Sequence, residues 1–217
     1  LWAKVENSSE LIPILLIQRW DDSNEHDRKI IEQAFGMEYS KCSEVLVKYK
    51  NVTDPPLLNI GNLWRLTSPL DAWLILSNFL NSTNIERLRK IATEVICEPD
   101  PEFDLNEDDR YKASFLGKVR QYSSWIREGI LQTLTLLSIY GTRGKEIEKN
   151  KGIVSQIIHN FLDNATELRW FSLSNILPQI AEASPESFLS SVEKSLNEST
   201  PKIKVLFREG EDKLFSR

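Results

Sequence analysis

Signals for helix starts recur along the whole chain, and they constrain its fold more than any other feature. The clearest is Ser68-Pro69-Leu70-Asp71, in which a serine cap is followed by proline at the first helical position and by an acid at the third. Ser184-Pro185-Glu186 repeats this pattern near the other end. The composition agrees, because 28 leucines stand against 9 valines and only 8 glycines. These features predict an all-α fold.

Apolar residues between these signals follow helical spacing, and no convincing polar–apolar alternation competes with them. The spacing predicts two antiparallel helices on either side of Asn81 and a central helix that ends at Tyr140. The class of 57–66 stays open between a short helix and an extended connector. The expected helices cover roughly 9–20, 24–35, 40–50, 68–80, 82–96, 106–119, 123–140, 153–162, 173–181 and 184–196.

Two of these helices carry apolar faces that we expect to be buried, and Pro178 predicts a kink in a third helix. The faces comprise Tyr111, Phe115, Leu116 and Val119 in the helix capped by Asn106, and Phe188, Leu189, Val192 and Leu196 in the last helix.

The helices show no constant repeat, so we expect an irregular α-solenoid or a multi-helix bundle of stacked helical hairpins. The diproline Pro55-Pro56 breaks the helical pattern and divides the chain into an N-terminal helical segment, 1–54, and a helical repeat-like domain, 55–217. Because the chain begins at Leu1 without a methionine, we expect a fragment of a longer chain. Stacked hairpins leave extended concave surfaces, which generally bind other macromolecules.

Charge and cysteine content exclude several classes of function. A net charge of −5 and a pI near 5.3 give the chain no general attraction to nucleic acid or to an anionic membrane. Cys42 and Cys97 are too few for a disulfide framework or a four-ligand zinc site, so we expect two reduced thiols in a cytoplasmic protein. The longest apolar stretches fall short of the roughly 20 residues that a membrane span needs. No membrane span, metal or cofactor is predicted.

One residue pair fits a catalytic spacing. Arg19 and His26 are separated by six residues, which loosely matches the arginine–histidine spacing of helical ribonucleases of the HEPN family. That resemblance implies that the pair cleaves RNA at the seam of a dimer. The intervening 20–25 indicate a helix stop followed by a new cap, which would place both residues on a loop. A HEPN-like RNase that uses Arg19 and His26 is an alternative function.

The acidic stretch 100–106 superficially resembles a calcium-binding loop, with oxygen ligands at alternate positions. Leu105 stands where such a loop needs glycine, and Tyr111 stands where it needs glutamate. We therefore expect a solvated acidic loop without a metal.

Basic and aromatic side chains alternate over 111–127, where no acid occurs. This pattern can clamp nucleic acid or an acidic peptide, although the acidity of the whole chain favours a packing role for the aromatic residues. Trp2 is a further residue that could reach a partner. The candidate partner-binding residues are Trp64, Lys118, Arg120, Trp125 and Arg127.

Three segments, 61–73, 110–129 and 177–189, resemble the helical region that follows the ATPase core in large bacterial STAND-type NTPases, several of which act in antiphage defence. The resemblance covers about 57–217 and rests on helix-packing patterns. It implies that the parent chain binds ATP while this region senses a target or mediates assembly, and it carries over no nucleotide-binding residue. The segments contain Gly61-Asn62-Leu63-Trp64, Tyr122-Ser123-Ser124-Trp125 and Leu177-Pro178-Gln179-Ile180.

The expected function is thus a non-catalytic helical interaction or sensor module of a larger bacterial NTPase. Its partners would be proteins, either a second copy or another chain, and no small-molecule substrate is evident. The alternatives are the RNase with Arg19 and His26 and a helical nucleic-acid-binding module with Lys118, Arg120 and Arg127. The acidic charge of the chain argues against the nucleic-acid module.

Overall fold

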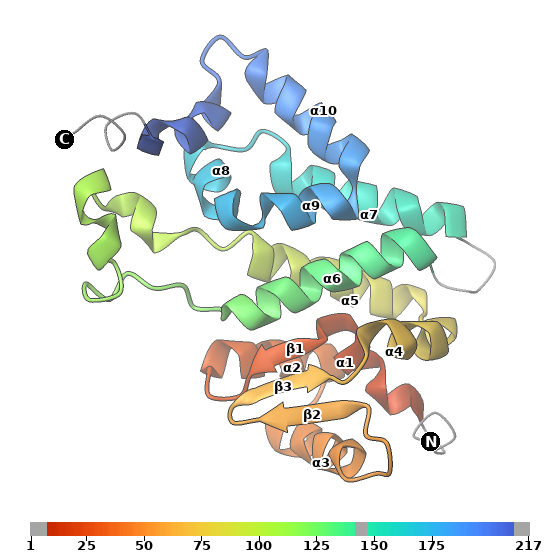
Figure 1. Ribbon diagram of the computed structural model, residues 1–217. Helices are drawn as coiled ribbons and strands as arrows, with labels where there is room; N and C mark the ends of the chain where they lie inside the picture. The colour runs from red at the N-terminus through yellow and green to blue at the C-terminus, as the bar shows by residue number, and fades with distance from the viewer. Residues whose placement is uncertain (1–7, 142–146, 211–217) are drawn as a thin grey trace.

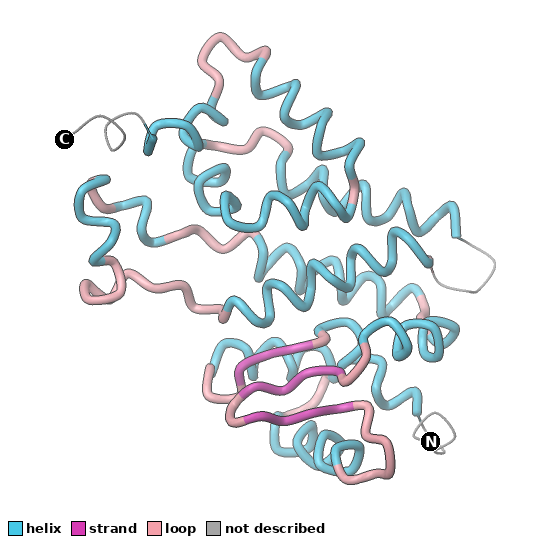
Figure 2. The backbone as a smooth tube through the Cα atoms, in the orientation of Figure 1, coloured by secondary structure: helices cyan, strands magenta, loops and turns pink. Residues whose placement is uncertain are grey.

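Helices make up most of the protein, and a small antiparallel sheet lies at one end (Figures 1 and 2). The computed structural model describes residues 8–141 and 147–210, so Trp2 lies outside the described residues. Within these ranges, no helix is both long and apolar enough to cross a bilayer. The mostly helical class agrees with the sequence-based prediction.

The first part of the chain forms the sheet and the helices around it. Its elements are η2 (Ser8–Leu11), α1 (Ile12–Ile17), β1 (Arg19–Asp21), α2 (Glu25–Phe35), α3 (Tyr39–Lys50), β2 (Leu57–Ile60), β3 (Leu63–Leu66), α4 (Pro69–Leu76) and η3 (Ser77–Phe79). The later elements are helical and are α5 (Ser82–Ile96), η4 (Pro101–Asp104), η5 (Glu107–Lys112), α6 (Ser124–Tyr140), α7 (Ile147–Leu162), α8 (Glu167–Leu173), η6 (Ser174–Ile176), α9 (Leu177–Ala183), α10 (Pro185–Leu196) and η7 (Lys202–Gly210).

The sheet has the strand order β1-β3-β2, and both pairs are antiparallel. Segment 57–66 is a hairpin, because Gly61, with a φ of +59°, and Asn62 form the two-residue turn between β2 and β3. β1 replaces the predicted last turn of the first helix, since Gln18 adopts a φ of +65° and redirects the chain. These three strands are a small exception within the mostly helical class, and β1 pairs with β3 across the predicted boundary at residue 54.

One hydrophobic core connects the sheet to the later helices, and α6 lies at its centre. α6 packs against α1, β1, α5, α7 and α9, which confirms that this helix sits between neighbours. Gly129 permits the approach of the α1–β1 connection, because a Cβ atom there would lie 2.2 Å from the backbone oxygen of Ile17 and 3.0 Å from Cγ of Arg19. The glycine in mid-helix is therefore explained by packing.

Helix starts are the best-predicted local feature. The side chains of Asn24, Ser68 and Ser123 accept backbone N–H groups in the first turns of α2, α4 and α6, as caps do. α10 begins at Pro185 as predicted, although Ser184 makes no such cap hydrogen bond.

Two predictions about helix pairing and kinking are wrong. The helix expected over 173–181 is split into α8, η6 and α9, because Pro178 lies in the first turn of a new helix instead of kinking a continuous one. α4 and α5 do not form the expected hairpin, since η3 intervenes. Instead α4 packs on α1, while α5 packs mainly on α2, α6 and α7.

The buried face of α10 differs from the predicted one, because two leucines expected on it are exposed. Leu189 and Leu196 are 58% and 52% exposed, whereas the side chains turned toward the protein are those of Ser187, Ser191 and Ser195. α10 packs against α7, α9 and η7. Small serine side chains therefore occupy part of the buried face on which helical spacing predicts Leu189 and Leu196.

Candidate interaction surface

The chain between α5 and α6 leaves the body of the protein and returns to it (Figure 1, light green). We call residues 101–119 the projection; it contains η4, η5 and the turns that follow them. The prediction of one helix from Asn106 to Val119 is wrong. The short helix η5 ends at Lys112, and Gly117 adopts a φ of +68°, which a continuous helix does not allow. Asn106 also makes no side-chain cap hydrogen bond.

The apolar side chains expected to be buried there lie in solvent instead. Tyr111 is 76% exposed, Phe115 91%, Leu116 56% and Val119 59%, and we call these four residues the tip patch. Single exposed apolar residues are ordinary on a protein surface, whereas a group of this kind within one short segment marks an interaction site.

The charged groups of the projection leave an excess of negative charge beside the tip patch. Two lysines are already paired with acids, in the contacts Lys118–Asp104 at 3.2 Å and Lys112–Asp109 at 3.3 Å. Glu107 and Asp108 are exposed, and no ion pair holds either of them among the residues that the structure describes.

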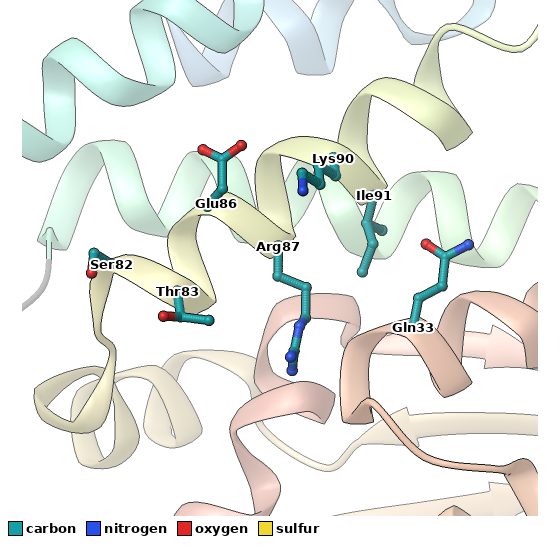
Figure 3. A pocket seen from close by; sticks show the side chains of 7 residues that line it. All are labelled: Gln33, Ser82, Thr83, Glu86, Arg87, Lys90 and Ile91. Atoms are coloured by element: carbon teal, nitrogen blue, oxygen red, sulfur yellow. The ribbon is translucent and has the colours of Figure 1, made fainter.

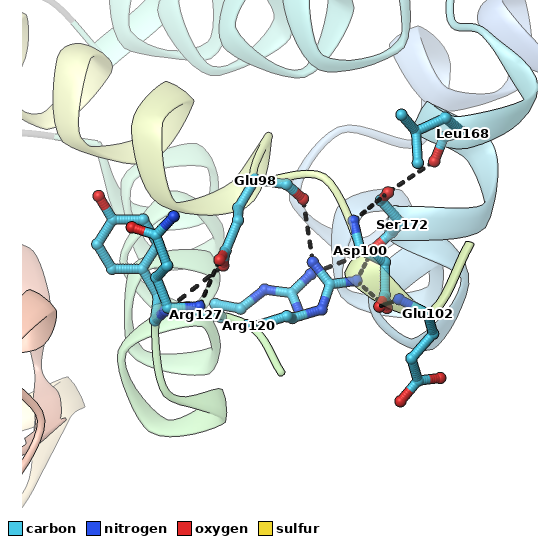
Figure 4. A network of polar contacts seen from close by, with 9 residues as sticks. Glu98, Asp100, Glu102, Arg120, Arg127, Leu168 and Ser172 are labelled. Atoms are coloured by element: carbon cyan, nitrogen blue, oxygen red, sulfur yellow. Dashed lines mark hydrogen bonds and ion pairs between the residues drawn. The ribbon is translucent and has the colours of Figure 1, made fainter. Parts of the chain in front are cut away.

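The base of the projection is fixed by a buried guanidinium group (Figure 4). Arg120 donates hydrogen bonds to the backbone oxygen of Glu98 at 3.0 Å, to the carboxylate of Asp100 at 2.6 Å and to the backbone oxygen of Ser172 at 2.6 Å. The side chains of Arg120 and Asp100 are only 15% and 10% exposed. Because these bonds involve a charged donor and little water, they hold both arms of the projection against α8.

A second arginine completes this network, which we call the arginine anchor and define as Glu98, Asp100, Arg120, Arg127 and Ser172. Arg127 donates to the same backbone oxygen of Ser172 at 3.3 Å, and burial, with the nearby Arg120, lowers the pKa of Arg127 to about 10. The hydroxyl of Ser172 accepts the backbone N–H of Asp100 at 2.8 Å. The anchor therefore joins the two ends of the connection between α5 and α6 to α6 and α8.

Asp27 ties the returning arm of the projection to the sheet end of the protein. Its fully buried carboxylate accepts the backbone N–H of Ser123 at 3.0 Å, the hydroxyl of Ser123 at 2.5 Å and the backbone N–H of Asp21 at 2.9 Å. Burial raises the pKa of Asp27, and the hydrogen bonds from Ser123 and Asp21 act in the opposite direction. The structure thus combines a fixed base with an exposed apolar tip.

The predicted partner-binding residues divide between the interior and the surface. Trp64 is only 6% exposed and stacks on Trp20, with ring centroids 5.9 Å apart. Arg120 and Arg127 belong to the arginine anchor, so their guanidinium groups are engaged inside the protein. Trp125, 41% exposed, lies on the surface. Lys118 is partly exposed and is paired with Asp104.

Arg19 and His26 occupy separate environments and are not on a loop. Arg19 lies in β1 and donates hydrogen bonds to Glu128 at 3.2 Å and to Gln132 at 2.7 Å. His26 lies in the first turn of α2, edge-on to the ring of Tyr122 at 6.0 Å between centroids. Among the described residues, no hydrogen bond joins the two side chains that an RNase would need together.

A hollow between α2 and α5 is lined mainly by polar side chains (Figure 3). Its volume is about 710 Å³, and at its edge Arg87 donates a hydrogen bond to the backbone oxygen of Ala34 at 2.7 Å. Its lining consists of Gln33, Ser82, Thr83, Glu86, Arg87, Lys90 and Ile91. No group of three or more histidine, cysteine, aspartate or glutamate side chains that could hold a metal ion occurs within 8–141 and 147–210.

Comparisons with known proteins give no information on this surface. No protein-family model, curated protein or solved structure matches the chain. The helical spacing of the tip residues predicts, wrongly, that they are buried. The signal that could have exposed them is Gly117, which interrupts the expected helix.

Proposed function

We propose that this protein is a non-catalytic interaction module that binds another polypeptide through the tip patch. The observation that carries the proposal is the exposure of Tyr111, Phe115, Leu116 and Val119 on a projection whose base is buried and hydrogen-bonded. Covering apolar surface releases about 25 cal/mol per Å². Binding through these four side chains therefore has a clear driving force.

The arginine anchor lowers the cost of such binding. A flexible loop loses conformational freedom when it docks, at about 0.5–1.5 kcal/mol for each immobilised side chain, in addition to the cost of ordering its backbone. The bonds from Arg120 to Asp100 and Ser172 hold the two ends of the projection in place before a partner arrives. Preorganisation of this kind supports a binding role.

The resemblance of 57–217 to the helical region of STAND-type NTPases supports a sensor or assembly role in a larger bacterial protein. On this proposal the chain itself does not bind nucleotide. Isothermal titration of the purified chain with ATP should therefore give no saturable heat, and saturable binding would overturn this part of the proposal.

Photo-crosslinking tests the binding role directly. Benzoylphenylalanine is placed at Phe115, and as a matched control at Leu189, which is exposed on α10. In extracts of cells that produce the protein, irradiation should give a covalent adduct with a polypeptide from position 115 and little from position 189. Equal labelling at both positions, or no adduct at position 115, contradicts the proposal.

A further inference from the structure

A second exposed apolar and charged group lies on η7. Phe207 is 70% exposed, and Lys202 and Lys204 are exposed beside it, whereas Ile203 and Val205 are buried at 5% and 7% and attach the helix to the core. Residues three apart share a face of a 3₁₀-helix, so Lys204 and Phe207 point the same way. We call Lys202, Lys204 and Phe207 the η7 patch.

The tip patch and the η7 patch are complementary in charge. Glu107 and Asp108 flank the first, and Lys202 and Lys204 belong to the second. In the part of the chain that the structure describes, none of these four side chains is in an ion pair. Opposite charge around two apolar groups steers them together and excludes like-charged partners.

The projection and η7, which carry the two patches, lie on the same side of the protein, and α8 packs against both η4 and η7 (Figure 1). A copy related by a twofold axis on this side would meet the tip patch with its own η7 patch and would offer its own tip patch in return. Each contact then forms twice, and the assembly closes as a dimer.

We infer that the polypeptide bound by the tip patch is a second copy of this chain, docked through its η7 patch. The inference rests on the proposed binding role of the tip patch and names its partner. Phe207 of each copy enters the apolar group around Phe115 of the other, and the lysines of η7 face Glu107 and Asp108.

Sedimentation velocity on the purified chain tests the inference. The chain should show a reversible, concentration-dependent dimer, and the double variant Phe115→Ser/Leu116→Ser should sediment as a monomer over the same concentrations. Leu189→Ser removes a comparably exposed apolar side chain from α10 and should leave the dimer unchanged.

Charge reversal identifies the two faces. Glu107→Lys/Asp108→Lys and Lys202→Glu/Lys204→Glu should each weaken the dimer by roughly tenfold or more, because like charges then face each other. A chain that carries all four substitutions should recover the dimer. All these side chains are exposed, so circular dichroism should show an unchanged fold.

A monomeric chain at every concentration overturns the inference, as does a dimer that persists in the Phe115→Ser/Leu116→Ser variant or fails to recover in the fourfold variant. These outcomes are separable from failure of the proposed function. An adduct from position 115 with a different protein keeps the binding role and removes self-association, whereas the absence of any adduct removes the binding role itself.

Discussion

The base and the tip of the projection belong to one short stretch of chain but have opposite surroundings. At the base, Asp100 and Arg127 are buried, Arg120 is largely buried, and all three side chains are hydrogen-bonded. At the tip, Phe115 and Leu116 are in water. Although Phe103 and Ala113 of the projection are turned inward, these polar groups lie inside and these apolar groups outside, which reverses the ordinary arrangement.

This reversal separates the forces that hold the projection from the surface that it presents. Hydrogen bonds from Arg120 to Ser172 and Asp100 fix the base, together with the packing of Phe103 in η4 against Phe171 in α8. The apolar side chains of the tip patch take no part in these contacts and remain free for another surface. The account predicts that changes at the base alter stability and that changes at the tip alter association.

The largest expected effect is at the base, for Arg120→Ala. This substitution leaves the Asp100 carboxylate buried without its cation and should lower the free energy of unfolding by about 3–5 kcal/mol, as measured by urea denaturation. Lys118→Ala is the matched control, because the Lys118–Asp104 pair is exposed and should contribute at most about 1 kcal/mol. Similar losses in both variants would contradict the distinction between base and tip.

A smaller effect is expected at Gly129, where the helix that follows the base meets the α1–β1 connection. Gly129→Ala should destabilise the protein by about 1–3 kcal/mol in thermal or urea unfolding, because its Cβ would lie 2.2 Å from a backbone oxygen. Gly152→Ala in α7 meets no atom within 4 Å and should stabilise by about 0.5–1 kcal/mol. Stabilisation by both variants would show that the close contact with Ile17 is absent.

The tie through Asp27 should appear as a pH dependence. Because the pKa of Asp27 is raised in the fold, its contribution to stability is fully present below the ordinary value of 3.8 and is lost as pH rises through the folded pKa. Relative to Asp27→Asn, which cannot ionise, the wild type should lose stability over this rise. Urea unfolding of both proteins from acid to neutral pH measures it. A constant difference between them would contradict the assigned direction.

The smallest effect on stability is expected at the tip. Phe115→Ser/Leu116→Ser should change the free energy of unfolding by no more than about 0.5 kcal/mol, because neither side chain is buried. Leu134→Ser in the core of α6 provides the contrast and should cost several kcal/mol. A large loss of stability in the tip variant would mean that the tip packs against the body of the protein.

The sequence predicts the helical class and several helix starts, because caps such as Asn24 and Ser68 act within one turn of chain. It also indicates the α6 core from the apolar residues on several of its sides. The hairpin at 57–66 carries a local signal, the Gly61-Asn62 turn, that helical spacing obscures. β1 has no such signal, since three residues become a strand only because β3 lies beside them.

The candidate surface is only partly predictable for a related reason. Residues 111–119 show helical spacing, and whether they are buried depends on neighbours that a local pattern does not contain. The sequence predicts Arg120 and Arg127 to be exposed cations, because it does not reveal that the distant residue Ser172 accepts hydrogen bonds from both. The same holds for α10, because its contact with α7 determines that the serines and not Leu189 and Leu196 are buried.

Hydroxyl-radical footprinting tests the central claim, that the tip patch is covered by protein when the molecule functions. The oxidation rates of Tyr111, Phe115 and Leu116 are compared between cells that contain the protein and dilute purified chain, with Leu189 as the reference. We predict that the tip residues are strongly protected in cells relative to Leu189. Equal oxidation of the tip in both settings would contradict the account.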